Sequence, residues 1–113
     1  MDCLFCKIAA GEIPSNIVYQ DDTVVAFRDI NPQAPQHILL IPRRHIESMA
    51  NLTSEDGPIL ASIYTTASRL ARELGIEQSG YRFLTNVGLD AGQSVFHLHF
   101  HLLGGRPLGW PPG

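Results

Sequence analysis

Three histidines, His97, His99 and His101, alternate with apolar residues near the C-terminal end of the chain. This period of two is typical of a strand and predicts one over residues 95–103. Its three imidazoles would share one exposed face, about 6.5 to 7 Å apart, while the apolar side chains of residues 96–102 pack on the other. Because a neutral imidazole can be a nucleophile, a proton carrier or a metal ligand, three in register indicate chemistry.

A loop that contains glycine, Asp90-Ala91-Gly92-Gln93-Ser94, immediately precedes the histidines. Glycine lets the main chain approach a ligand, and free amides with Gln and Ser side chains can donate to phosphate oxygens. A plain turn has the same composition, so the phosphate interpretation depends on the histidines beside the loop.

Two further polar residues stand at the ends of predicted strands. Asp29 follows a strand predicted over residues 23–28, where it either caps the amides of a turn or accepts the two hydroxyls of a ribose. His37 begins a strand predicted over residues 36–41, which is apolar and therefore central to the sheet. A histidine there is structural, unless the strand pairs beside the histidine strand and adds a fourth imidazole to the pocket.

Cys3 and Cys6 form a Cys-x-x-Cys pair that is too close in sequence to staple a fold by a disulfide. A structural zinc ion would need two further ligands, for which His45 and His97 are the candidates. The alternative is a pair of solvated or buried thiols.

The rest of the chain divides into short elements separated by Gly, Pro and Asp. Apolar residues at spacings of three and four predict one long helix that starts at Thr53 or Ser54 and ends at Gly75. The other expected elements are a helical turn over residues 3–10, a hairpin of strands 16–20 and 23–28, and a strand over 81–86. The tail, residues 104–113, should have no regular structure.

Composition limits the classes of function. The chain has 113 residues, 44% of them hydrophobic and 17% charged, and we expect a single domain over residues 1–113. A formal net charge of −3 argues against binding a nucleic-acid polymer, although a small nucleotide is still allowed. The sequence has no charged leader and no long apolar run, so we expect a cytoplasmic protein without a membrane partner.

Four separated motifs carry a resemblance to a known family. Residues 97–103, His-Leu-His-Phe-His-Leu-Leu, match the His-φ-His-φ-His-φ-φ signature of the histidine triad superfamily. Residues 29–37 (DINPQAPQH), 92–95 (GQSV) and 110–113 (WPPG) resemble the Hint branch of that superfamily, in the same order along the chain.

The resemblance implies an α+β fold in which a five-stranded antiparallel sheet is joined by one long helix and a short N-terminal helix. It implies a homodimer whose two sheets form one continuous sheet. The implied activity is hydrolysis of the P–N bond of purine nucleoside phosphoramidates, of the AMP-amine or AMP-lysine type, through a nucleotidyl-histidine intermediate.

The resemblance also implies roles for individual residues. His99 attacks phosphorus, His101 and His37 stabilise charge on the phosphate oxygens, and the pocket of imidazoles gives the departing amine its proton. Ser94 contacts the leaving nitrogen. The implied nucleotide contacts are Asp29 and Ile30 to ribose, Asn86, Gly92, Gln93 and Ser94 to ribose or phosphate, Phe5, Ile8 and Phe27 to the purine, and Trp110 to the partner's site.

Bacterial members of the superfamily bind structural zinc through residues that match Cys3, Cys6, His45 and His97. The resemblance therefore implies a zinc ion that orients the histidine segment without touching phosphate, so that no catalytic metal is required. His97 then supports the site and does not transfer a proton.

Three alternatives follow from the same residues. His97, His99 and His101 could hold one catalytic metal ion, as in a metallohydrolase. The protein could bind nucleotide without turnover. Within the superfamily, the same triad serves dinucleoside polyphosphate hydrolases and nucleotidyl transferases.

Overall fold

The computed structural model describes residues 3–113; Met1 and Asp2, which belong to the domain expected over 1–113, lie outside the described residues. The observed elements agree with the predicted α+β fold, which is confirmed. They are α1 (Leu4–Ala9), β1 (Ile17–Gln20), β2 (Val24–Arg28), β3 (Gln36–Pro42), α2 (Gly57–Glu73), β4 (Tyr81–Leu84) and β5 (Phe100–Gly104), with 3-10 turns at Met49–Asn51 and Ser54–Asp56.

The five strands form one antiparallel sheet in the order β1-β2-β3-β5-β4, so β3 is central as predicted. β3 pairs directly with β5, with Leu39 opposite His101 and His37 opposite Leu103. Opposed residues lie on the same face of a sheet, as do residues two apart on one strand. His37 and His101 therefore lie on one face, diagonally across the β3 and β5 pair.

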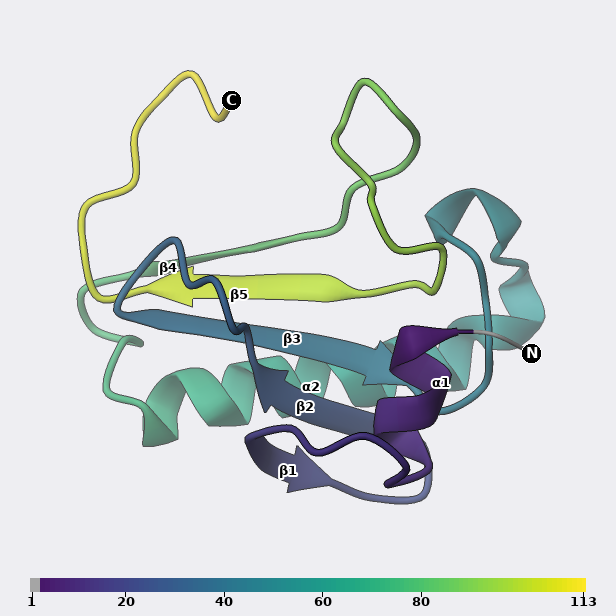
Figure 1. Cartoon of the computed structure of the whole chain (residues 1–113). Coiled ribbons are helices and arrows are strands. Elements are labelled where there is room, and N and C mark those ends of the chain that lie inside the picture. The colour runs from purple at the N-terminus through teal and green to yellow at the C-terminus, as the bar shows by residue number, and fades with distance from the viewer. Residues whose placement is uncertain (1–2) are drawn as a thin grey trace.

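The two helices cover opposite faces of the sheet (Figure 1). α2 packs against the face formed by alternate residues such as Ile38, Leu40 and Leu102, which are fully buried. α1 packs against the other face through Phe5 and Ile8. The face beneath α1 is the one that carries His37 and His101.

α2 begins and ends near the predicted limits. A capping box between Thr53 and Asp56 precedes it and satisfies amides at the start of the turn. The helix ends at Glu73, and Gly75 follows with a φ of 75°, the left-handed conformation that glycine adopts at helix ends.

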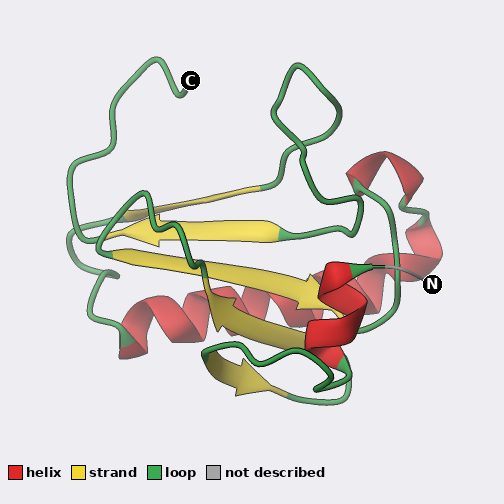
Figure 2. Ribbon diagram, in the orientation of Figure 1, coloured by secondary structure: helices red, strands yellow, loops and turns green. Residues whose placement is uncertain are grey.

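The histidine strand is shorter than predicted. It begins at Phe100, and Figure 2 draws the segment before it as a loop. The ladder with β3 stops at Leu40 and Phe100, and the amide of Leu98 donates to the carbonyl of Ile46 instead. The alternating sequence therefore did not show where a neighbouring strand is present for pairing.

The predicted exposed row of histidines is also wrong. His97 is 0% exposed and His99 is 7% exposed, whereas Phe96, which was expected to pack inside, is 60% exposed. The chain turns inward at residues 97–100, where four consecutive residues are buried. Leu98, Phe100 and Leu102 are buried as predicted.

β4 ends at Leu84, two residues before the predicted end, so Asn86 lies in the loop that follows. Beyond β5 the tail has no helix or strand, as predicted. The guanidinium of Arg106 donates to the carbonyl of Gln33 at 3.1 and 2.9 Å, which fixes the tail to the loop between β2 and β3. Among residues 3–113 no helix is long and apolar enough to cross a membrane.

Gly105 offers a test of the contact between this loop and the tail. Its φ is 94°, and a Cβ added there would lie 2.9 Å from Cβ of Pro35. We expect Gly105→Ala to lower the free energy of unfolding by about 1 to 3 kcal/mol more than Gly80→Ala, because Gly80 has a similar φ of 109° but open space around it. Urea unfolding of both variants measures the difference. Equal losses in the free energy of unfolding would mean that Pro35 moves aside at no energetic cost.

Candidate active site

A cavity of about 400 Å³ opens on the face of the sheet beneath α1. Apolar side chains form most of its wall, and polar groups are gathered where β5 and the preceding segment meet. The lining residues include Phe5, Ile8, Phe27, Asp29, Ile30, Leu39, Ser94, Val95, His99 and His101. A mostly apolar pocket with a few convergent polar groups is the usual form of a small-molecule site.

His99 is held in one tautomer by a backbone carbonyl. Its Nδ1 lies 2.7 Å from the carbonyl oxygen of His97, and because a carbonyl can only accept, Nδ1 carries the proton. Nε2 of the neutral ring therefore carries a lone pair. The ring of Phe5 packs edge-on against His99 with centroids 5.1 Å apart, which fixes the orientation of the imidazole.

His37 and His101 form a directed chain of hydrogen bonds. The amide of Gln33 donates to Nδ1 of His37 at 3.0 Å, so the neutral ring carries its proton on Nε2. That nitrogen lies 2.9 Å from Nδ1 of His101, to which it donates. His101 consequently carries its own proton on Nε2, as a donor beside His99, whose ring centroid is 5.2 Å away.

Burial keeps these imidazoles neutral. It lowers the pKa of His37, against the opposing attraction of Asp29. Burial, together with the neighbouring rings of His99 and His37, lowers the pKa of His101 to about 4. Both rings are therefore uncharged near pH 7, which makes the tautomer assignments above the relevant ones.

Asp29 is a turn residue, as one of its two predicted roles requires, and it also lines the cavity. One carboxylate oxygen accepts from the amide of Asn31 at 2.8 Å, as a turn residue does. The other lies 3.4 Å from Nε2 of His37, and the residue lines the cavity. The carboxylate is thus held by the loop and still faces the cavity.

The sequence-predicted residues divide into two groups. Phe5, Ile8, Phe27, Asp29, Ile30, Ser94, His99 and His101 line the cavity, and His37 touches it through His101. Asn86, Gly92, Gln93 and Trp110 do not line it. Trp110 is 83% exposed in the tail, and Ile30 is 99% exposed at the rim.

The side chain of Gln93 stabilises the loop by hydrogen bonds, whereas the sequence suggested that it donates to phosphate. The amide is buried, accepts from the amide of Gly88 at 3.0 Å and donates to the carbonyl of Glu47 at 2.9 Å. These hydrogen bonds hold the loop that carries Ser94 against the segment after β3.

Sequence reasoning missed two residues that orient the histidines. Thr85 donates from its hydroxyl to the carbonyl of His99 at 2.7 Å, and the amide of Gln33 sets the tautomer of His37. Both act across tertiary contacts, so no local pattern marks them. Leu39 in the cavity wall follows from the alternation of β3, because it lies on the same face as His37.

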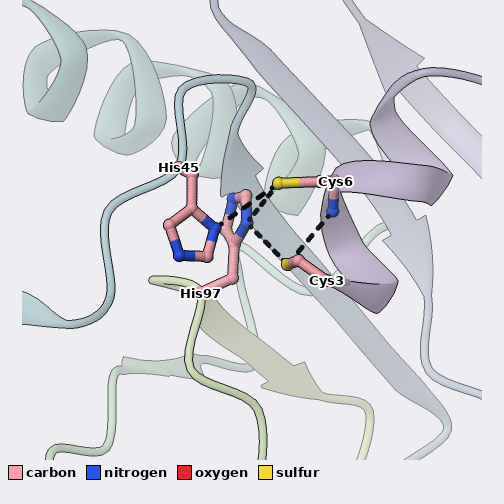
Figure 3. A group of neighbouring side chains, drawn as sticks. All are labelled: Cys3, Cys6, His45 and His97. Atoms are coloured by element: carbon pink, nitrogen blue, oxygen red, sulfur yellow. Dashed lines mark hydrogen bonds between the residues drawn. The ribbon is translucent and has the colours of Figure 1, made fainter. Parts of the chain in front are cut away.

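Cys3, Cys6, His45 and His97 meet beside the cavity, as Figure 3 shows. Cys3 caps α1, and its sulfur lies 3.4 Å from Nδ1 of His97. The sulfur of Cys6 lies 3.4 Å from Nδ1 of His45 and 3.6 Å from Nδ1 of His97. The group could hold a metal ion, because its four ligand atoms lie within 4.8 Å of one another.

The geometry of this group fits a tetrahedral ion with sulfur and nitrogen ligands. Bonds of about 2.3 Å to sulfur and about 2.0 Å to nitrogen at tetrahedral angles separate the two ligand atoms by about 3.6 Å. The sulfur to nitrogen distances above match this value. Nε2 of His97 donates to the carbonyl of Pro42 at 2.8 Å, which leaves Nδ1 as the lone pair directed at the thiols.

Asp29, His37 and His101 also lie close enough together to suggest a metal site. The hydrogen bond from Gln33 to Nδ1 of His37 argues against one, since the facing Nε2 is then an N–H donor and has no lone pair to offer. This second group is a hydrogen-bonded network. His97 belongs to the thiol cluster, His101 belongs to this network and His99 belongs to neither, which is not the arrangement that a metallohydrolase with one shared ion requires.

Comparison with known proteins agrees with this geometry. The family model described as the HIT domain matches residues 10–108. The purine nucleoside phosphoramidase of Escherichia coli K12 is 50% identical over 108 residues, which cover 96% of this chain and 91% of that protein. The crystal structure of a HIT family hydrolase from Legionella pneumophila is 50% identical, with a TM-score of 0.98 over 99% of this chain and 100% of that one.

A histidine triad protein from Clostridium difficile gives a TM-score of 0.93 at 48% identity, and the match covers 96% of this chain and 95% of that one. Sequence and fold thus agree over nearly the whole length of each relative. The chain belongs to the HIT domain family.

Proposed function

We propose that this protein is a hydrolase that cleaves the P–N bond of purine nucleoside phosphoramidates, with His99 as the nucleophile. The observation that carries the proposal is the hydrogen bond from Nδ1 of His99 to the carbonyl of His97, which leaves Nε2 with a lone pair in a nearly buried position. The E. coli relative named purine nucleoside phosphoramidase supports the same reaction.

In the first step Nε2 of His99 attacks the phosphorus of the substrate. A bond forms between Nε2 and phosphorus, and the P–N bond to the amine breaks. Its electron pair leaves with the amine nitrogen, which takes up one proton. A covalent nucleotidyl-histidine divides one difficult displacement into two easier ones.

In the second step water attacks the same phosphorus. An O–P bond forms, the bond from phosphorus to Nε2 breaks, and the electron pair returns to His99. Water releases one proton, and the products are nucleoside monophosphate and free histidine. The carbonyl of His97 supports the charge on the ring of His99 whenever that ring carries both a proton on Nδ1 and a bond on Nε2.

His101 and His37 are proposed to stabilise charge on the phosphate oxygens. In the free protein both rings are neutral, because burial lowers the pKa of each, so the proton for the departing amine is not stored on them. A bound phosphate places negative charge beside His101 and favours its protonated form. The substrate therefore brings the charge that allows this pair to accept and pass on a proton.

The cavity supplies surfaces for the rest of a nucleotide. Phe5, Ile8 and Phe27 offer an apolar wall for a purine, and Asp29 with Ile30 stands where a ribose would meet the rim. Ser94 lines the same cavity, and its proposed role is to contact the leaving nitrogen. The contacts expected for Asn86, Gly92, Gln93 and Trp110 stay predictions, since none of these four lines the cavity in one chain.

We further propose that the ion suited to Cys3, Cys6, His45 and His97 is structural zinc. Two thiolates and two imidazoles are a common ligand set for zinc in closed structural sites. When bound, zinc ties α1 and the segment after β3 to His97, whose carbonyl orients His99. Burial and the neighbouring Cys3 raise the pKa of Cys6, so ion binding must displace a thiol proton.

A homodimer is proposed with β4 as the strand at the interface. β4 is the edge strand next to β5. Its Tyr81 is 40% exposed, and Tyr64 on α2 is 55% exposed. Pairing of two β4 edges would make one continuous sheet and bring the exposed Trp110 of each tail to the partner. We also propose that residues 1–113 form a single domain. The two free thiols suit a reducing compartment such as the cytoplasm, which is the proposed location.

Removal of the nucleophile tests the central step. His99→Ala should lower kcat/KM for an AMP-amine substrate at least about a thousandfold, because no other group can form the bond to phosphorus. Intact-mass analysis after rapid quenching should find a nucleotidyl adduct on the wild type and none on the variant. His99→Gly with added imidazole is the control, since a free imidazole can occupy the vacant space and restore part of the rate.

The substrate panel should include diadenosine polyphosphates and a GMP-amine. The proposal is wrong if the polyphosphates are cleaved much faster than the amines, and it is also wrong if nucleotide binds without either turnover or adduct.

Zinc binding is tested by composition and stability. Native mass spectrometry should find one zinc ion per chain, and a chelator should lower Tm of the wild type, because the ion stabilises only the folded state. Cys3→Ser should bind less zinc, and its Tm should respond less to the chelator. Turnover should survive chelation as long as the chain stays folded, whereas immediate loss of activity at an unchanged fold would favour a catalytic metal.

The pKa of His101 predicts a dependence of stability on pH. Its folded pKa is about 4, below the ordinary value of 6.5, so the unfolded chain binds protons first as pH falls. Stability should be greatest above pH 6.5 and fall between pH 6.5 and about 4. His101→Gln should flatten this slope in thermal unfolding between pH 7 and pH 4.5; parallel curves would show that His101 does not contribute.

A further inference from the structure

A second cavity, of about 510 Å³, adjoins the cavity of about 400 Å³ beneath α1, which is called the nucleotide cavity below. The two cavities share part of their walls, at the N-terminal end of α1 and at the segment before the histidines. The shared residues are Leu4, Ser94 and Val95, and the second cavity is completed by Cys3, His45, Glu47 and Phe96. The cavities beside α2 and beside the tail share no lining residue with the nucleotide cavity.

Under the proposed function Ser94 contacts the leaving nitrogen, and Ser94 lines both cavities. The nucleophile approaches phosphorus on the side opposite the leaving group, so the amine must point away from Nε2 of His99. Ser94 stands on the wall between the two cavities. A substrate with its purine beneath α1 thus has one large neighbouring space into which an amine can extend.

Glu47 gives this second cavity its charge. Among the described residues that form the wall, it is the only one with a formal charge at neutral pH. The two arginines that precede it are engaged elsewhere: Arg43 donates to the carbonyls of Asp21 and Ala9, and Arg44 pairs with Asp56. The adjacent cluster adds no net charge, because a zinc ion with two thiolates and two neutral imidazoles sums to zero.

The rest of the wall suits the body of an alkyl amine. Phe96 is 60% exposed and Leu4 is 48% exposed, and both apolar side chains line the same cavity as Glu47. An exposed aromatic ring attracts a cation through its face, and apolar side chains pack against methylene groups. The bond of 2.9 Å from Gln93 to the carbonyl of Glu47 holds this residue at a fixed place relative to the loop of Ser94.

We propose that this second cavity receives the amine portion of the substrate, and that Glu47 selects amines that carry a second, positively charged group. The inference rests on the proposed function and names the substrate class of the same site. Glu47 acts on specificity and takes no part in bond making. An ammonium at the far end of the amine pairs with its carboxylate, while Phe96 and Leu4 pack against the chain between the ammonium and the P–N bond.

Three adenosine phosphoramidates of equal length test the inference. Their amines are a pentane diamine, with a distal ammonium, aminopentanol, with a distal hydroxyl, and aminohexanoate, with a distal carboxylate. Wild type should cleave the diamine derivative with a kcat/KM about three to ten times that of the hydroxyl derivative, the gain expected from one partly exposed charge pair. The carboxylate derivative should be the slowest, and added salt should compress the order.

Glu47→Gln should bring the ratio of the diamine to the hydroxyl derivative close to one, and Glu47→Lys should favour the carboxylate derivative. Because each ratio is measured within one protein, a loss of folded material cancels. Glu55→Gln removes an equal charge from the exposed turn before α2 and should keep the wild-type ratio. The expected effect is in kcat/KM, which includes amine departure, whereas hydrolysis of the nucleotidyl-histidine is common to all three substrates.

Equal rates for the three substrates on wild type would overturn the inference, as would a wild-type preference that persists in Glu47→Gln. Either result leaves the proposed function standing, provided that P–N cleavage and the adduct on His99 are observed. Absence of cleavage for every amine would instead refute the proposed function itself.

Discussion

The hydrogen bond from Nδ1 of His99 to the carbonyl oxygen of His97 is the interaction on which the site depends. It requires the chain at residues 97–99 to be held in one conformation. Three contacts supply this: the ring of His97 donates to Pro42, Thr85 donates to the carbonyl of His99, and the amide of Leu98 donates to Ile46. Two of these contacts come from the end of β3 and the segment after it, and the third comes from the loop after β4, so tertiary contacts orient the nucleophile.

Burial of several imidazoles is energetically unfavourable unless each ring nitrogen has a partner. Among the described residues no buried side-chain nitrogen or oxygen lacks one. The partners also decide the chemistry, because each fixes a tautomer: Gln33 for His37, His37 for His101, and the carbonyl of His97 for His99. The same hydrogen bonds therefore stabilise the fold and, in the neutral tautomer of His99, place the lone pair on Nε2.

The sequence predicted the elements and the sheet well, because β2 and β3 are apolar nearly throughout and are buried on both faces, and the apolar positions of α2 recur at helical spacing. It predicted the four ligands of the thiol cluster, because residue type limits the candidates. It misjudged the segment before β5, since alternation cannot show whether a neighbouring strand is present for pairing. Gln33 and Thr85 gave no local signal, because their contacts arise only when distant segments meet, and the same holds for the role proposed for Glu47.

The neutrality of the imidazoles explains how a chain with net charge −3 can act on a phosphate. Among the described residues, Arg28 is the only arginine or lysine that lines the cavity beneath α1, and its guanidinium donates to Gln36. N–H donors without full charge bind a ground-state phosphate weakly. They respond strongly when charge develops on the phosphate oxygens and a ring can be protonated. Because the pKa values of His37 and His101 are low in the free protein, we expect these rings to stabilise the phosphate oxygens mainly in the reacting state and only weakly in the ground state.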